Sequence, residues 1–363
     1  MTHAHRSIPG LRRLATAALI VSSLALAGCD KPAPTPGTPE ALNAALERAV
    51  DDAIVPSIEA FATQGRELDD AVESFCAAPD AEALAAAQTQ WRETATRWNR
   101  AVLYNFGPLN GDIFAPKIHY IESMRQRGID YTTKVRHEID RQLTAETPLD
   151  TAHFQALRQN QTGLLPLEIL LFESTAKGHP QAASAILSDF RDHPRKCDYL
   201  AGISDRLRAD AAYVASGWTE AFKDSGEPYR DRFLAGNLDR GATPLAVLFT
   251  SVQGHLDYLE RRKLDGTLDA RLADHFYANV TATLDELGRL VEGEHGFLAE
   301  AEARGHGDIA LAVRQMLDAA RQSAEDRDRA ALTRQVETLW KLFREKLPGA
   351  LGVDLGINFS DGD

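Results

Sequence analysis

The chain has 363 residues, of which 40 are Lys or Arg, 53 are Asp or Glu and three are Cys. This length and a hydrophobic content of 44% allow a sizeable buried core and indicate a globular protein rather than a disordered one. The formal charge of −13 weighs against nucleic acid as a partner, because a phosphate-binding surface needs clustered cations.

The start of the chain has the pattern of an export signal. Residues 1–13 are basic and polar, and the apolar residues 14–27 are too few for the ~20 that a helix needs to cross a bilayer. The stretch Leu26-Ala27-Gly28-Cys29 resembles the lipobox of bacterial lipoproteins, in which the cysteine receives a lipid after cleavage. We therefore expect a signal peptide over 1–28 and a membrane anchor at Cys29, in the bacterial cell envelope and facing the periplasm. Cleavage at an ordinary small-residue site, with the cysteine unmodified, is the alternative.

The next residues predict a tether. Residues 31–39 hold four prolines and one glycine, so the segment 29–39 is expected to be a semi-stiff linker, and the folded body begins near Glu40. Without the basic leader, 37 basic and 53 acidic side chains remain, which gives the mature chain a charge of −16.

Cys76 and Cys197 remain as a pair once Cys29 is assigned to the anchor. Thiols in an oxidising compartment commonly end as disulfides, so we favour a bridge between them over two buried free thiols. The bridge would close a loop of 121 residues, for which chain entropy gives an upper stabilisation of about 5 kcal/mol.

Apolar residues recur at intervals of three or four along almost the whole body, which predicts helices. Clear series are Trp91, Ala95, Trp98, Val102 and Phe106; Leu245, Leu248, Val252, Leu256 and Leu259; and Leu332, Val336, Leu339, Phe343 and Leu347. The four tryptophans, Trp91, Trp98, Trp218 and Trp340, lie on such stripes and are predicted to belong to the core. We predict an all-α fold of about ten helices packed as two helical bundles.

The break at residues 224–229 (DSGEPY) is the best candidate domain boundary. It gives an N-terminal helical domain over 40–224 and a C-terminal helical domain over 225–363. The last thirteen residues cannot continue a helix, yet apolar residues alternate within them from Leu351 to Phe359. This alternation predicts a non-helical tail that docks on the second domain.

Four segments of the body carry a family resemblance. They are the stretch from Trp91 and Trp98 into Asn105-Phe106-Gly107-Pro108, residues 163–172, residues 195–200 and residues 351–363. In this order they resemble the imelysin-like family of bacterial envelope proteins, which is classed as peptidase family M75. The resemblance implies a two-domain helical fold with a functional site between the halves. It also implies an association with iron uptake in some members and a disputed peptidase activity in others.

The motif of this family, Gly-x-His-x-x-Glu, falls on Gly163, Leu165 and Glu168. Leu165 takes the place of the histidine, and a leucine side chain has no lone pair to give to a metal. A site that relies on the imidazole would lose a ligand, which weakens the peptidase interpretation and leaves open whether the chain is an enzyme.

Glu168 lies in the apolar stretch 164–172, where a carboxylate is costly to bury without a partner. One interpretation makes it a buried ligand or charge partner at the functional site. The other makes Pro166 the first residue of a helix, so that Glu168 lies in the first turn and bonds the exposed N–H groups there. Three arginines could reach inward to pair with it: Arg92, Arg97 and Arg100.

The pair His119-x-x-Glu122 puts an imidazole and a carboxylate on one helical face, close enough to share a cation. An ordinary exposed face is the alternative. The leading hypothesis is a non-catalytic binding module in periplasmic metal handling, with iron as the favoured metal, another divalent metal as the alternative and envelope iron-uptake proteins as partners. A metallopeptidase whose ligands have moved to His119, Glu122 and Glu168, and an acidic protein-interaction module, are the rivals.

Overall fold

The computed structural model describes residues 34–112, 115–122, 132–174, 179–238, 241–264 and 269–355. The expected signal peptide, Cys29 and residues 356–363 of the tail lie outside these ranges. The described residues form helices and connecting turns without a β-strand, which confirms the all-α prediction. No helix among them is long and apolar enough to cross a membrane.

The body begins with a long helical rod. Thr38 caps its start by accepting a hydrogen bond from the backbone N–H of Ala41. The rod then runs through α1 (Pro39–Ala49), the π-helical η1 (Val50–Ile54) and α2 (Val55–Ala77) without an intervening loop. Its apolar residues recur at helical spacing and lie in the core, so the rod is held by packing along its whole length.

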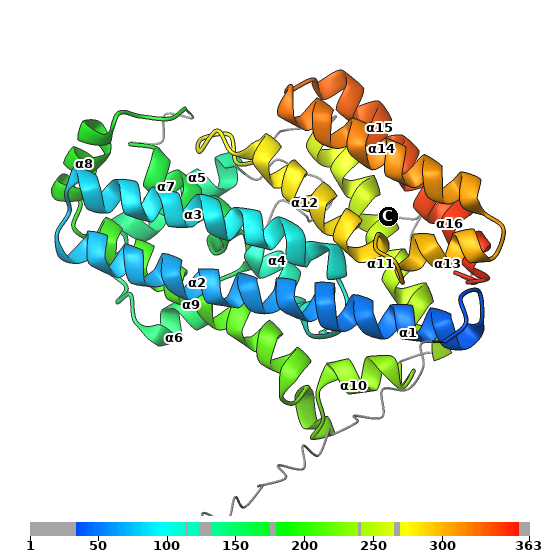
Figure 1. Cartoon of the computed structure of the whole chain (residues 1–363). Helices are drawn as coiled ribbons and strands as arrows, with labels where there is room; N and C mark the ends of the chain where they lie inside the picture. Colours follow the sequence, from blue (N-terminus) through cyan, green and yellow to red (C-terminus); the bar gives the residue numbers. More distant parts are fainter. Residues whose placement is uncertain are drawn as a thin grey trace, which may run out of the picture. The chain divides into compact units, whose positions relative to one another are not determined.

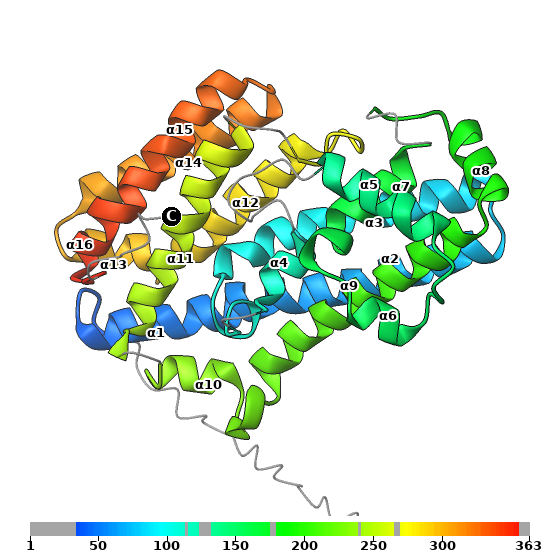
Figure 2. The same ribbon diagram turned by 180° about the vertical axis from the view of Figure 1, so that it is seen from behind.

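Two further long helices pack on this rod (Figure 1). Asp80 caps α3 (Ala81–Ala101), which returns alongside α2, and α9 (Arg195–Thr219) covers α2 from another side. The remaining elements before α9 are short: η2 (Val102–Tyr104), η3 (Gly107–Leu109), α4 (Lys117–Ile121), α5 (Thr132–Thr144), α6 (Thr151–Gln155), η5 (Gln159–Gln161), α7 (Leu164–Phe172) and α8 (Ala183–Asp192). Among them α7 packs against α3, α5 and α9 (Figure 2).

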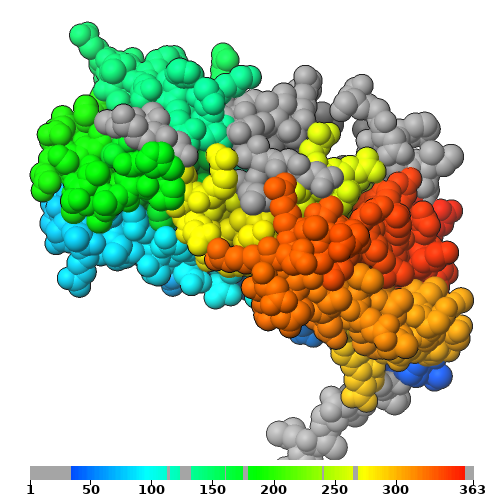
Figure 3. Space-filling view, turned by 90° about the horizontal axis from the view of Figure 1, so that it is seen from above, coloured from blue at the N-terminus to red at the C-terminus, as the bar shows by residue number. Residues whose placement is uncertain are grey.

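The chain after α9 forms a second group of helices. They are η6 (Lys223–Ser225), α10 (Tyr229–Leu234), α11 (Pro244–Tyr258), the π-helical η8 (Leu259–Leu264), α12 (Phe276–Val291), α13 (Phe297–Ala303), α14 (Gly307–Glu325), α15 (Arg329–Lys341), the π-helical η9 (Leu342–Lys346) and α16 (Leu347–Leu351). α12 packs on α3 as well as on α14, so it joins this group to the first. Figure 3 shows the yellow stretch that leads into α12 between the green and orange parts of the surface.

From Pro34 onward the chain belongs to one compact unit, and the domain boundary near residue 224 stays a prediction. Trp91, Trp98 and Trp218 are almost fully buried, in agreement with their predicted place in the core. Trp340 is only partly buried. In the tail, Val353 and Leu355 pack on the core, and the docking of the tail as a whole stays a prediction.

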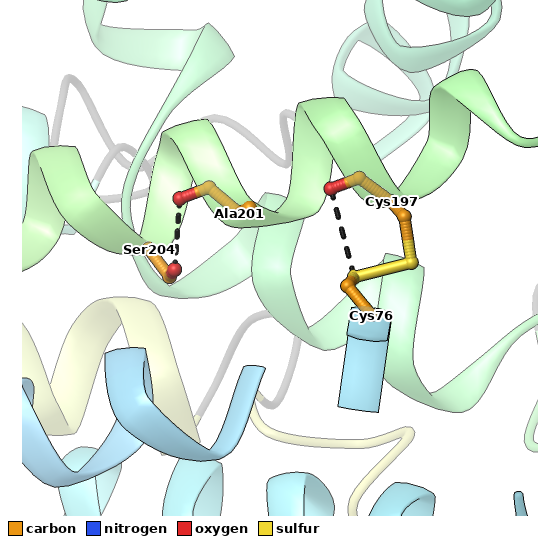
Figure 4. The surroundings of a disulfide bond; sticks show 4 residues. All are labelled: Cys76, Cys197, Ala201 and Ser204. Carbon is orange, nitrogen blue, oxygen red and sulfur yellow. Dashed lines mark hydrogen bonds between the residues drawn. A yellow bond between two sulfur atoms is a disulfide. The ribbon is translucent and has the colours of Figure 1, made fainter. Parts of the chain in front are cut away.

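The structure contains the disulfide between Cys76 and Cys197, with 5.4 Å between the two Cα atoms. Figure 4 shows that it joins the end of α2 to the first turn of α9, and that Ser204 lies on the same helix further along. There the Ser204 hydroxyl donates a hydrogen bond of 2.5 Å to Asp69 of α2, and Arg208 pairs with the same carboxylate at 3.0 Å. The bridge is therefore part of a longer set of contacts that hold α2 against α9.

Candidate functional site

The motif glycine permits a close approach of two helices. Gly163 precedes α7 with φ 90° and ψ −162°, a backbone conformation that is essentially restricted to glycine. A Cβ atom at this position would lie 2.4 Å from the carbonyl oxygens of both Tyr120 and Ile121, at the end of α4. The glycine is therefore required by the packing of α4 on the start of α7, whether or not the motif has a chemical role.

Glu168 is 3% exposed and bonds to a distant loop rather than to its own helix. Its Oε1 atom accepts hydrogen bonds from the backbone N–H groups of Leu272, at 2.8 Å, and Ala273, at 3.0 Å. The alternative that placed Glu168 in the first turn of a helix opened by Pro166 is wrong, because α7 begins at Leu164, two residues earlier. The carboxyl group ties α7 to the segment that leads into α12.

Burial dominates the protonation of Glu168. Loss of hydration, helped by the charge of Asp269, raises the pKa of this carboxyl group to about 8. The hydrogen bonds from Ala273 and Leu272 and the charge of Arg271 oppose the shift without cancelling it. Below pH 8 the folded protein therefore carries a proton on Glu168.

Of the three candidate arginines, Arg92 binds the loop that Glu168 also binds, and its charge interacts with that of Glu168. Its Nε atom donates a 3.0 Å hydrogen bond to the carbonyl oxygen of Ala273, and its guanidinium lies 4.8 Å from the centre of the Phe172 ring. Arg92 thus holds the same loop as Glu168 without an ion pair to it. Arg100 instead pairs with Asp285 on α12, at 3.3 Å.

A cavity of about 50 Å³ lies beside Glu168, which is room for a few water molecules. Residues from several elements line it, among them Trp91, Trp98, Glu122, Leu165, Asp269 and Asn279. Leu165, at the position of the motif histidine, is one of the lining residues, so a histidine here would have placed its ring at the same cavity. The cavity brings together two of the predicted site residues, Glu122 and Glu168.

A buried lysine forms the charged part of the site. The Nζ atom of Lys263, on η8, lies 2.6 Å from Oδ2 of Asp269, 3.1 Å from Oε1 of Glu122 and 3.3 Å from Oδ1 of Asn99. Burial alone would lower the pKa of Lys263, but the charges of Asp269 and Glu122 outweigh it and raise the pKa above its usual value. The ammonium is therefore firmly charged.

Glu122 is fully engaged by its neighbours. Its Oε2 atom accepts a 2.7 Å hydrogen bond from the indole N–H of Trp98, and its Oε1 atom accepts one of 3.1 Å from the hydroxyl of Tyr258, in addition to Lys263. Asp269 retains one open oxygen, because Oδ1 is buried without a hydrogen-bond partner among the described residues. Burial raises the pKa of Asp269, and the charge of Lys263 opposes this shift.

His119 does not line the cavity. α4 ends at Ile121, and Glu122 follows it with φ −128°, outside the helix, so the spacing of three residues does not keep the two side chains on one helical face. In the described ranges, no three His, Cys, Asp or Glu side chains lie together in a way that could hold a metal ion. The role of His119 as a ligand stays a prediction.

The residues present do not fit a metal ion in the cavity. Glu122 has both oxygens in hydrogen bonds or ion pairs, burial raises the pKa of Glu168 to about 8, and the ammonium of Lys263 already occupies the place between Glu122 and Asp269. A transition metal would need deprotonated ligands with open lone pairs. We therefore derive no chemistry through a metal here.

Most of the charged part of the site has no signal in the sequence. Lys263 follows Arg261 and Arg262, a run that is typical of a solvated face, and Asp269 lies outside any recognisable motif. Trp98 was correctly predicted as a core residue, but nothing in its helical stripe indicated that its N–H also binds Glu122.

The end of the first family segment lies apart from the cavity. Gly107 has φ 58°, and a Cβ atom there would lie 2.4 Å from the ring of Tyr229. Pro108 is buried against Gly217 of α9, where a Cβ atom would meet the proline ring at 2.7 Å. These two motif residues therefore serve the packing of α9 and α10 and do not line the cavity around Glu168.

The fold and the site define a class of all-α proteins with a charged cavity at the junction of α3, α7 and the segment before α12. The chain belongs to the imelysin family, peptidase family M75, whose model matches residues 54–352.

Known relatives agree with this assignment. Iron-regulated protein A of Synechococcus elongatus is 29% identical over 255 residues, which cover 68% of this chain and 61% of that protein. The chain therefore spans less than two thirds of this curated relative. An imelysin-like protein from Psychrobacter arcticum has the same fold, with a TM-score of 0.70 and 18% identity over 90% of this chain and 99% of that one. A candidate iron-regulated protein A precursor from Parabacteroides distasonis also has this fold, with a TM-score of 0.62 and 15% identity. The match covers 89% of this chain and 96% of that one.

Proposed function

We propose that the protein is an exported, non-catalytic member of the imelysin family that works in iron handling at the bacterial cell envelope, with the cavity beside Glu168 as its ligand-binding site. The observation that carries the proposal is the environment of the motif acid. Glu168 is buried, is bonded by two backbone N–H groups and has Leu165 where a histidine would assist it, and burial raises its pKa to about 8. A general base needs a free lone pair and a matched pKa, and a metal ligand needs an ionised carboxylate.

The non-catalytic part is tested with the purified full chain and an unfolded protein as substrate, with and without a chelator. We expect no cleavage above background and no difference between the wild type and Glu168→Gln. Chelator-sensitive cleavage that Glu168→Gln abolishes would contradict the proposal and support the metallopeptidase alternative.

The iron part draws support from the names of the relatives, two of which are described as iron-regulated protein A or its precursor. We expect deletion of the gene in its native bacterium to lower the iron content of cells grown under iron limitation. Envelope proteins of iron uptake are the proposed partners.

Complementation asks whether the cavity is needed for this role. Leu165→Phe fills the cavity with a larger apolar side chain, and Leu311→Phe, at a position that is 53% exposed, is the matched control. The wild type and Leu311→Phe should restore cellular iron, and Leu165→Phe at equal abundance should not. Unchanged iron in the deletion strain would contradict the iron role, and full restoration by Leu165→Phe would contradict the use of the cavity.

The export and anchoring part rests on the leader and on Cys29. A Cys29→Ser variant should leave the membrane fraction and appear in the soluble periplasmic fraction, while the wild type stays with the membrane. Mass spectrometry of the wild-type N-terminus should find a lipidated cysteine. An unmodified N-terminus at another residue would contradict the anchor.

A further inference from the structure

We propose that Lys263 is a built-in cation behind three residues that line the cavity beside Glu168, that its ammonium occupies the place between Glu122 and Asp269 where a divalent metal would sit, and that the chain binds no metal ion there. The inference deepens the proposed function, because it narrows the ligands that the same cavity accepts.

The geometry around the lysine is that of a coordinated cation. Three oxygens surround its Nζ atom at 2.6, 3.1 and 3.3 Å, and they come from Asp269, Glu122 and Asn99. The lysine side chain is only 4% exposed. An ammonium has three N–H donors, so these three acceptors satisfy it completely.

The ammonium opposes a second cation at the same place. A divalent ion bonded to the oxygens of Glu122 and Asp269 that contact Lys263 would lie close to Nζ and be repelled by it. Hard cations bind oxygens at about 2.0–2.6 Å, and Lys263 already lies between the oxygens of Glu122 and Asp269 that such an ion would need.

The open polar atoms of the cavity are acceptors. Oδ1 of Asp269 and Oδ1 of Asn279 are buried without hydrogen-bond partners among the described residues, and both residues line the cavity. Such atoms suit the N–H or O–H donors of a small ligand or of water. The cavity is thus built for a small hydrogen-bond donor beside an internal ion pair.

The test is Co²⁺ binding by the purified full chain, measured by equilibrium dialysis and by the visible absorption of bound Co²⁺. We expect no stoichiometric Co²⁺ in the wild type. Lys263→Met removes the cation but keeps the length of the side chain, so one Co²⁺ per chain should bind, and the added change Asp269→Asn should abolish it. Lys341→Met, at an exposed lysine on α15, should bind as little Co²⁺ as the wild type.

Two results would overturn the inference. One is a wild-type chain that binds one Co²⁺ and loses it in Asp269→Asn, and the other is a folded Lys263→Met that binds none. If Lys263→Met does not fold without metal, thermal unfolding with added Co²⁺ decides, because the inference expects Co²⁺ to restore a folding transition and no restoration would contradict it. The two proposals fail separately. Co²⁺ binding by the wild type would contradict this inference but not the proposed iron role, and normal iron content in the deletion strain would contradict the iron role but not this inference.

Discussion

Glu168 on α7 accepts a 2.8 Å hydrogen bond from the backbone N–H of Leu272, which lies 104 residues later in the chain. The acid of the family motif therefore acts here as a bond between two distant segments. The backbone N–H of the next residue, Ala273, donates to the same oxygen, and its carbonyl oxygen accepts a hydrogen bond from Arg92. One short loop is therefore held by a glutamic acid and by an arginine. The arrangement stabilises the junction of α7 with the segment before α12.

The stability of the protein should depend on pH through Glu168. Its pKa is about 8 when folded and about 4.5 when unfolded, so between these values the folded state holds more protons. The free energy of unfolding should therefore fall as pH rises across this window, by at most about 1.4 kcal/mol per pH unit. In Glu168→Gln this contribution is absent. In urea unfolding, the free energy of unfolding of the variant should therefore rise relative to that of the wild type between pH 4.5 and 8.

The control for this experiment is Glu337→Gln, at an exposed carboxylate on α15 that pairs with Lys341. Its stability should follow that of the wild type through the same pH range. If the difference between Glu168→Gln and the wild type does not change with pH, the carboxyl group is not protonated in the fold.

Gly163→Ala should destabilise the protein strongly. The substitution places a Cβ atom against two carbonyl oxygens of α4 and forces a conformation that costs about 1–3 kcal/mol for a residue other than glycine. Gly254→Ala is the matched control, because Gly254 lies in α11 and a Cβ atom added there would have nothing within 4 Å, so this variant should gain about 0.5–1 kcal/mol. Equal unfolding midpoints for the two variants would contradict the close approach of α4 to α7.

Loss of the disulfide should cost up to about 5 kcal/mol, because the bridge closes a loop of 121 residues in the unfolded chain. Cys76→Ser combined with Cys197→Ser should lower the urea midpoint, and a reducing agent should shift the wild type to the same value without affecting the double variant. A midpoint insensitive to reduction would show that the bridge adds nothing to stability.

Trp98→Phe should lower the free energy of unfolding by more than the loss of packing alone. The variant leaves Oε2 of Glu122 without its hydrogen-bond donor inside the core. An unsatisfied buried acceptor adds about 1–3 kcal/mol, or more where it is charged. The added change Glu122→Gln should recover part of this cost, since a neutral amide is less costly to leave unpaired. A double-mutant cycle from urea unfolding measures the coupling, and a coupling of zero would contradict the hydrogen bond.

The sequence predicted the helices because their signal is local. The stripes through Trp91 and Leu332 repeat every three or four residues, and each of these residues lies in the core. Glu168 could also be found, since a carboxylate within an apolar run has to be buried with a partner. That partner is the backbone of Leu272 and Ala273, and backbone N–H groups carry no sequence signal.

The charged cluster was not predictable, because it forms only through the fold. Lys263 contacts Glu122 and Asn99, which both lie more than 140 residues earlier in the chain. Its neighbours in sequence are ordinary surface arginines. The pairing of His119 with Glu122 was predicted from helical spacing. In the fold Glu122 leaves the helix at its end and lies at the cavity, which His119 does not line.

The most direct test of the central claim, that the motif acid is a protonated structural group, is an infrared titration of Glu168. The difference between the wild type and Glu168→Gln isolates the C=O stretch of its protonated carboxyl group. We predict that this band is present at pH 6 and disappears with a midpoint near 8, with no effect of added Co²⁺ or chelator. An ionised Glu168 at pH 6, or a band that responds to the metal, would contradict it.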